Sequence, residues 1–276
     1  MSVIAPSVEY KAQNDPPFEL PSSVELRTDL IYATALGEDW RLDLFVPRER
    51  AVSRSGVVYV HGGGWRGGTR QQFWRHAAHM AARGFVGACI QYPLTPRHTY
   101  PRQLELPQAA VRWLRHQSDE LGVDPSRIGA VGGSAGGHLV ALLGCGDDVQ
   151  DGVSAKVDCV VAFNGVFDLA SMLTEAATSA IGGLIGGNVR YGVEGSPLSR
   201  ATASAAPTLL LHGDADTTVP YAQSVAYQRR LNELGVRAEL YTEPGAAHGF
   251  FNRAPYFQRT LPVMERFLTK TLCTTR

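Results

Sequence analysis

Apolar and polar residues along the chain follow two kinds of pattern, and each pattern predicts a different element. Segments 25–34 ("ELRTDLIYAT") and 40–46 ("WRLDLFV") alternate between apolar and polar residues and predict two antiparallel strands joined near Gly37. A continuous apolar run at 55–61 ("SGVVYVH") predicts a strand that is covered on both faces. Further strands are expected at 85–92, 127–134, 157–165, 206–214 and 237–243.

Helical spacing of apolar residues appears between these strands. It predicts helices at 70–84, 102–122, 135–144, 224–235 and 256–272. Pro107 lies inside the second of them and is expected to kink it. Strands that alternate with helices of this length predict a mostly parallel sheet with helices on both faces, which is an α/β fold. We expect one domain over residues 1–276, beginning with an irregular arm at 1–24.

One segment, 167–203, interrupts this alternation. It is rich in Gly, Ser and Ala and carries the glycine pairs Gly182-Gly183 and Gly186-Gly187. We expect an inserted, mobile, lid-like segment here. The alternative is that its apolar side chains simply pack the segment onto the body of the protein.

Composition and charge exclude several classes of protein. Of the 276 residues, 44% are hydrophobic, enough for a large core, and 26 Lys and Arg balance 26 Asp and Glu. Without net charge there is no global basic field to hold a nucleic acid, so we expect no nucleic-acid partner. No window approaches the roughly 18 consecutive apolar residues that would indicate a membrane span. Residues 1–21 lack the basic start and apolar stretch of a secretory signal.

The four cysteines, Cys89, Cys145, Cys159 and Cys273, have no metal-binding spacing. We expect free, mostly buried thiols in a reducing cytoplasm, with a disulfide as the weaker alternative. We therefore predict a cytoplasmic protein without a metal or another cofactor.

The strongest chemical signal is G-x-S-x-G at Gly132, Ser134 and Gly136, between a predicted strand and a predicted helix. A serine on such a sharp turn needs neighbours that are almost free of side chains, and its hydroxyl is exposed for attack. The helix start also directs amides and a positive dipole end at the same place. The alternative is a small-residue turn whose serine caps the helix.

A serine nucleophile needs a histidine base and a carboxylate to orient it, in the order Ser, acid, His on a sheet of this kind. His248, in the small-residue loop "PGAAHGF", is the better base, because His212 directly precedes the candidate acids. Those acids are Asp214 and Asp216, and the spacing alone leaves both open. Among the earlier histidines, His61 is expected to make a structural hydrogen bond. His76, His79 and His116 are expected to be partly exposed on helices.

The glycine run Gly62, Gly63 and Gly64 in "YVHGGGWRGG" follows the strand that precedes the strand of Ser134. Bare backbone amides there, completed by the amide of Ala135, can stabilise the negative oxygen that forms during acyl transfer. A phosphate-binding loop is the alternative, but the G-K-[ST] ending is absent.

Together, "HGGGW", "GGSAGGHL", "HGDADTTVP" and "AAHGF" resemble the α/β-hydrolase fold, and within it the hormone-sensitive-lipase-like branch of carboxylesterases. "YPLTPRHTYP" is similar to the Y-R-L-A-P-E-x-x-F-P turn of that branch, although Pro93 and Arg97 replace its Arg and Glu. The tryptophan after HGGG resembles bacterial acetyl xylan and feruloyl esterases and, more loosely, kynurenine formamidases. The resemblance covers residues 25–272.

This resemblance implies a Ser134, Asp216 and His248 triad, with Asp216 matching H-G-x-x-D-x-x-V, and an oxyanion hole at Gly63, Gly64 and Ala135. It implies a cofactor-independent serine esterase that acts on a small-molecule ester. We expect Trp65 and Phe167 to contact that substrate. An arylformamidase and a non-catalytic ligand receptor on the same fold are the alternatives, and the choice between a monomer and a homodimer stays open.

Overall fold

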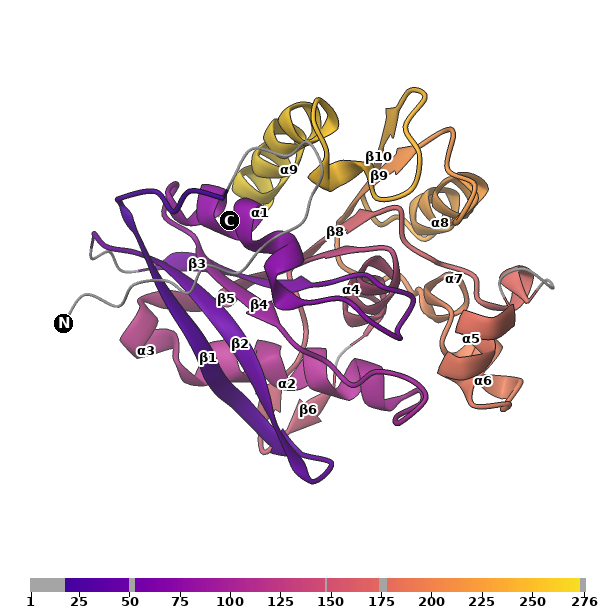
Figure 1. The fold of residues 1–276 in the computed structure, drawn as a ribbon, viewed down its shortest axis with the longest axis horizontal. Coiled ribbons are helices and arrows are strands. Elements are labelled where there is room, and N and C mark those ends of the chain that lie inside the picture. The colour runs from indigo at the N-terminus through magenta and orange to yellow at the C-terminus, as the bar shows by residue number, and fades with distance from the viewer. Residues whose placement is uncertain (1–17, 50–52, 147, 174–177, 274–276) are drawn as a thin grey trace.

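A computed structural model of the protein describes residues 18–49, 53–146, 148–173 and 178–273. Its centre is an eight-stranded sheet, whose strands are labelled in Figure 1. Across the sheet the strands run in the order β1 (Val24–Ala35), β2 (Glu38–Pro47), β4 (Val86–Ile90), β3 (Arg54–Val60), β5 (Val123–Gly133), β8 (Cys159–Phe163), β9 (Thr208–Gly213) and β10 (Ala238–Glu243). A separate hairpin pairs β6 (Val149–Gln150) with β7 (Val153–Ser154).

The direction of the strands confirms the predicted α/β fold. Strand β2 is antiparallel to both β1 and β4, and every pairing from β4 through β3 to β10 is parallel. In a parallel sheet the carboxyl ends of the strands meet at one edge, where ligand sites gather. The loops after β3, β5, β8 and β9 therefore converge on one place.

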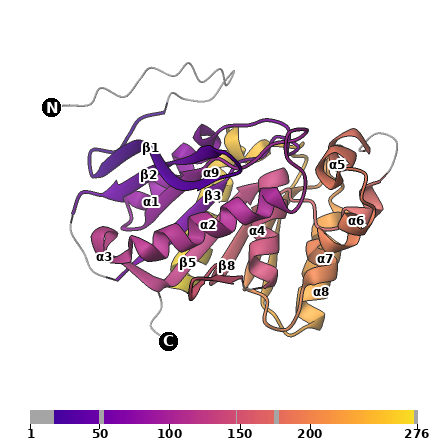
Figure 2. The same cartoon turned by 90° about the horizontal axis from the view of Figure 1, so that it is seen from below.

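Helices cover both faces of the sheet (Figures 1 and 2). On β3, Val58 and Val60 face the core beneath α2 (Arg102–His116), α4 (Ala135–Cys145) and α8 (Ala222–Glu233). The alternate residues Val57 and Tyr59 face the core beneath α1 (Trp74–Ala81) and α9 (Tyr256–Leu272). Successive side chains of a strand point to opposite faces of the sheet, so a continuous apolar run contributes side chains to the cores on both faces.

Two predicted helices differ in detail from the structure. The segment 70–84 begins as a 3-10 turn, η1 (Arg70–Phe73), before α1 starts. The segment 102–122 divides into α2 and the short α3 (Ser118–Leu121), and α2 continues through Pro107.

The segment 167–203 holds short helices at one end of the sheet, at the right of Figure 1. These are η2 (Ala170–Met172), α5 (Thr178–Ile185), α6 (Arg190–Glu194) and α7 (Pro197–Arg200). The carbonyl of Leu184 accepts the Tyr100 amide at 2.8 Å, and the amide of Leu169 donates to the Ser196 hydroxyl at 2.8 Å. The segment is thus fastened both to the body and to itself, and its motion as a lid stays a prediction.

The cysteines are in the predicted state. All four are free, three of them buried and Cys273 exposed. The prediction that His76 is partly exposed is wrong, because its ring is fully buried among Phe73, Phe163 and Phe257.

Residues 1–17 of the predicted N-terminal arm lie outside the described residues. Within the described part, none of the helices combines the length and the apolar character that crossing a membrane requires.

Candidate active site

Ser134 lies on the sharp turn between β5, which ends at Gly133, and α4, which begins at Ala135. Its φ of 55° and ψ of −119° lie in a region that side chains rarely adopt. A Cβ on Gly136 would run into the carbonyl oxygen of Val60, and one on Gly132 would run into the Gly136 carbonyl. Only glycine at these positions lets the turn close this tightly, and the turn exposes the hydroxyl at the end of the sheet.

The imidazole of His248 connects Ser134 to Asp216. Its Nε2 lies 2.9 Å from Ser134 Oγ, and its Nδ1 lies 2.7 Å from Asp216 Oδ2. An ionised carboxylate only accepts hydrogen bonds, so Nδ1 carries the proton and Nε2 is free to accept from the serine hydroxyl. The structure therefore brings these three predicted residues into one hydrogen-bonded chain.

The Asp216 side chain is fully buried, which favours its neutral form. Burial would raise the pKa of the carboxyl, but hydrogen bonds from His212, His248 and the Val219 amide outweigh it and hold the pKa well below its usual range. Oδ1 accepts from the backbone amides of Thr218 at 2.8 Å and Val219 at 3.0 Å. The carboxylate is consequently ionised and fixed in orientation.

The alternative acid and the alternative base have other partners. Asp214 is exposed, and its Oδ1 accepts the Gly245 amide at 2.6 Å. His212 is buried, with Nδ1 2.7 Å from the Ser224 hydroxyl and Nε2 3.2 Å from Asp216 Oδ2. Asp214 thus ties two loops together, whereas His212 supports the carboxylate from behind.

The glycine loop after β3 is held by its carbonyl oxygens. The Gly62 oxygen lies 2.8 Å from Nδ1 of His61, and the Gly63 oxygen accepts the amides of Arg66 and Gly67 at 3.1 Å. Burial lowers the pKa of His61 to about 4, so the ring is neutral and Nδ1–H is the donor. Because a trans peptide directs N–H opposite to C=O, the amides of Gly63 and Gly64 point away from these partners.

These two glycines, together with Ala135, line the same cavity as Ser134. Gly63 has a φ of 124°, a conformation open to glycine and strained for other residues. The Ala135 amide belongs to the first turn of α4, where amides have no partner within the helix. All three residues line the cavity with Ser134, and the oxyanion hole formed by their backbone amides stays a prediction.

Asn164 is a polar neighbour of His248 that the sequence did not reveal. It follows β8, is fully buried, and has a φ of 38°. Its Nδ2 lies 3.2 Å from Nδ1 and 3.3 Å from Nε2 of His248, while its Oδ1 has no hydrogen-bond partner among the described residues. The near-equal distances place the amide against the ring. The available signal was an Asn-Gly pair at the carboxyl end of a predicted strand.

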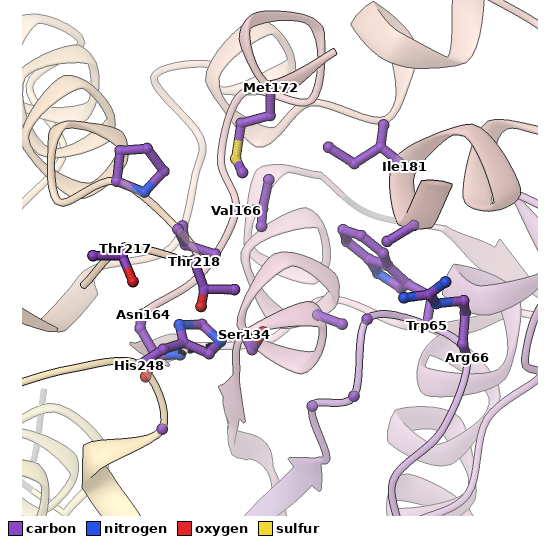
Figure 3. Close-up of a pocket in the computed structure, with 18 of the residues that line it drawn as sticks. Trp65, Arg66, Ser134, Asn164, Val166, Met172, Ile181, Thr217, Thr218 and His248 are labelled. Carbon is purple, nitrogen blue, oxygen red and sulfur yellow. Dashed lines mark hydrogen bonds between the residues drawn. The ribbon is translucent and has the colours of Figure 1, made fainter. Parts of the chain in front are cut away.

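The site opens into a cavity of about 620 Å³ (Figure 3). One wall is apolar and includes Trp65, Val166, Met172 and Ile181, of which the last two come from the segment 167–203. Trp65 lines the cavity, although only 2% of its surface is exposed, and its contact with a substrate stays a prediction.

The structure does not bring Phe167 to this cavity. Its ring is fully buried and stacks on Tyr227 with centroids 4.7 Å apart, so it belongs to the core under α8. Met172 and Ile181 take the place that the sequence assigned to it. No group of three or more His, Cys, Asp or Glu side chains in the described part of the chain is arranged to hold a metal ion.

Comparison with known proteins adds relatives to this geometry. The BD-FAE family matches residues 42–231. Esterase LipC of Mycobacterium tuberculosis is 32% identical over 211 residues, which cover 70% of this chain and 52% of LipC. Carboxylesterase NlhH of the same species is 32% identical over 215 residues, which cover 72% of this chain and 67% of NlhH. The chain thus spans about half of the length of LipC.

Among solved structures, the native thermophilic esterase Est2 of Thermogutta terrifontis superposes with a TM-score of 0.79 at 29% identity. The match covers 94% of this chain and 95% of that one. Est2 has also been solved with butyrate bound and, as esterase 2, phosphonylated by sarin. The sheet, the glycine loop and the family match agree, and this chain belongs to the BD-FAE family of the α/β-hydrolase fold.

Proposed function

We propose that the protein is a serine carboxylesterase that hydrolyses short-chain or aryl esters through an acyl-enzyme. The observation that carries this proposal is the hydrogen-bonded chain from Ser134 through His248 to Asp216 at the floor of an open cavity. The esterase relatives support the same reaction class.

In the first half-reaction, Ser134 Oγ attacks the ester carbonyl carbon while Nε2 of His248 takes the hydroxyl proton. The new C–O bond pushes an electron pair onto the carbonyl oxygen. The amides of Gly63, Gly64 and Ala135 would stabilise this oxyanion, and losing one such donor typically costs about 2.7–4 kcal/mol of transition-state stabilisation. Collapse breaks the bond to the alcohol oxygen, which receives the proton from His248.

In the second half-reaction, a water molecule attacks the acyl carbon and gives its proton to His248. The bond to Ser134 Oγ breaks, the serine recovers its proton, and the carboxylic acid leaves. Asp216 stays ionised throughout, fixes the imidazole tautomer and stabilises the imidazolium. This function is consistent with its lowered pKa.

The walls of the cavity support a small acyl group. Met172 and Ile181 line the cavity together with Trp65, and the related Est2 has been solved with butyrate. We infer that the substrate is a small-molecule ester with a short acyl chain or an aromatic group against Trp65.

An arylformamidase would use the same three residues on a C–N bond and is the second candidate. The test is to compare kcat/KM for p-nitrophenyl butyrate and phenyl acetate with that for N-formylkynurenine. We expect the esters to be hydrolysed with a stoichiometric burst of alcohol that reports the acyl-enzyme. Hydrolysis of the formamide alone would replace the esterase by the formamidase. Binding of esters without turnover would indicate a receptor.

A further inference from the structure

Arg66 is a cation on the wall of the cavity. It follows Trp65 in the glycine loop, its side chain is exposed, and it lines the cavity. No ion pair or side-chain hydrogen bond joins it to another described residue. Among the described residues that line the cavity there is no Asp, Glu or Lys, so Arg66 supplies the one permanent charge there.

Several other arginines of the chain are paired with carboxylates. Arg70, four residues further on, contacts Asp29 at 2.6 Å and Asp43 at 3.1 Å, and Arg112 contacts Asp148 at 2.8 Å. An arginine that faces a cavity without such a partner has its five donors available to a ligand.

The backbone of Arg66 is held firmly, although its side chain has no partner among the residues that the structure describes. Its amide donates to the Gly63 carbonyl at 3.1 Å, and the preceding Trp65 carbonyl accepts the Thr95 amide at 2.8 Å. The same loop carries Gly63 and Gly64, which also line the cavity. The guanidinium is therefore attached to a fixed backbone, in the same loop as Gly63 and Gly64, whose amides are proposed oxyanion donors.

Figure 3 shows where the charge lies in the cavity. Arg66 is drawn beside Trp65 on one side, and Thr217 and His248 lie on the other. A planar guanidinium binds a carboxylate through two parallel hydrogen bonds, and the neighbouring Trp65 lines the same cavity.

We propose that this cavity takes esters that carry a carboxylate, with the anionic end bound by Arg66 and the adjoining part of the substrate against Trp65. This inference rests on the proposed esterase function and adds the charge of the substrate to it. An ion pair between an exposed arginine and a carboxylate typically changes affinity by only a few-fold. We therefore expect Arg66 to affect the selectivity between anionic and neutral esters rather than the hydrolysis of esters in general.

The test compares two pairs of esters that are matched in size and differ in charge. In one pair the charge is on the alcohol: 4-carboxyphenyl butyrate against 4-carbamoylphenyl butyrate. In the other it is on the acyl group: the p-nitrophenyl monoester of glutaric acid against that of its monoamide. The measured quantity is the ratio of kcat/KM for the anionic ester to that for the neutral ester.

We expect this ratio to fall about fivefold in Arg66→Gln for at least one pair, and further in Arg66→Glu. Sodium chloride at about 1 M should lower the wild-type ratio, because it shortens the screening length to about 3 Å. Arg190→Gln is the matched control, since Arg190 is exposed on α6 and does not line the cavity. Its ratios should equal those of the wild type.

Ratios that are the same in wild type and Arg66→Gln for both pairs would overturn the inference. If the neutral esters are still hydrolysed by wild type and not by Ser134→Ala, the esterase proposal stands and only the charge preference is wrong. If wild type hydrolyses none of the four esters, both fail together.

Discussion

Nε2 of His248 lies 2.9 Å from Oγ of Ser134, although 114 residues separate them in the sequence. The contact forms because the loops after β5 and β10 reach the same edge of the sheet. Each partner is held independently, Ser134 by the turn into α4 and His248 by Asp216. The pair is therefore set in the folded chain before any ligand arrives.

Ser134→Ala should lower kcat by about 10⁴-fold or more, because it removes the atom that forms the acyl-enzyme. A fluorophosphonate should label the wild type at one site per chain and leave this variant unlabelled, as intact-mass spectrometry would show. Ser171→Ala is the matched control, since Ser171 also lines the cavity but contacts Gln223. Near-normal turnover by Ser134→Ala would end the esterase proposal.

Asp216→Asn should lower kcat by about 10⁴-fold while the protein stays folded, because an amide nitrogen facing Nδ1 favours the wrong imidazole tautomer. Asp214→Asn should act mainly on stability, by weakening the bond to the Gly245 amide. Steady-state kinetics and urea unfolding of the two variants separate these effects. If the kinetic loss belonged to Asp214, the assignment of the acid would be reversed.

Asn164→Gly should lower kcat by about tenfold with a smaller change in KM, because the His248 ring loses the amide that contacts both of its nitrogens. Glycine is chosen since it accepts the positive φ of this position. Steady-state kinetics give kcat and KM, and circular dichroism checks the fold. A kcat within twofold of the wild type would show that Asn164 only fills space.

A series of p-nitrophenyl esters should show kcat/KM rising from acetyl to about butyryl and falling well before a ten-carbon acyl chain. Each added methylene gains up to about 0.8 kcal/mol only while it finds apolar surface. Met172→Ala should move the optimum to longer chains by removing part of the wall. The neighbouring Leu173, which is 39% exposed and does not line the cavity, supplies the control Leu173→Ala. A maximum at twelve carbons would contradict the shape of the cavity.

His76 should make the protein less stable in acid. Burial, with the charges of Arg75 and His79, lowers the pKa of His76 to about 3, and its ring nitrogens have no hydrogen-bond partner in the part of the chain that the structure describes. Between about pH 6.5 and 3 the unfolded chain binds a proton that the folded chain does not. The free energy of unfolding then falls by about 1.4 kcal/mol per pH unit for this group as the pH decreases.

His76→Phe should remove that part of the slope, because a phenyl ring fits among Phe73, Phe163 and Phe257 without taking up a proton. Urea unfolding at pH 7 and pH 5 measures the slope. Buried His61 and His138, whose pKa values burial lowers to about 4, should leave a residual slope in the same direction. Exposed His116→Gln is the control, and equal slopes in wild type and His76→Phe would contradict the prediction.

The sequence alone determined the order of the eight strands of the central sheet and of the main helices between them, because periods of two and 3.6 residues record which faces are buried. It also predicted the sharp turn that carries Ser134. The turn joins two elements that are neighbours in the sequence, and it requires glycine at positions 132 and 136. His248 followed from its order after the serine and from the small residues of its loop.

The tertiary structure decided what depends on contacts between distant segments. Asp214 and Asp216 share one loop and one chemistry, and their spacing alone does not distinguish them, but in the structure only the buried Asp216 contacts His248. The sequence pattern around Phe167 is that of a residue that lines a pocket, and the pattern around His76 is that of a partly exposed residue. Both side chains are nevertheless buried beneath neighbouring elements. The local pattern fixes whether a side chain has an inner face, whereas the packing of another segment against it decides whether that face meets a core or a cavity.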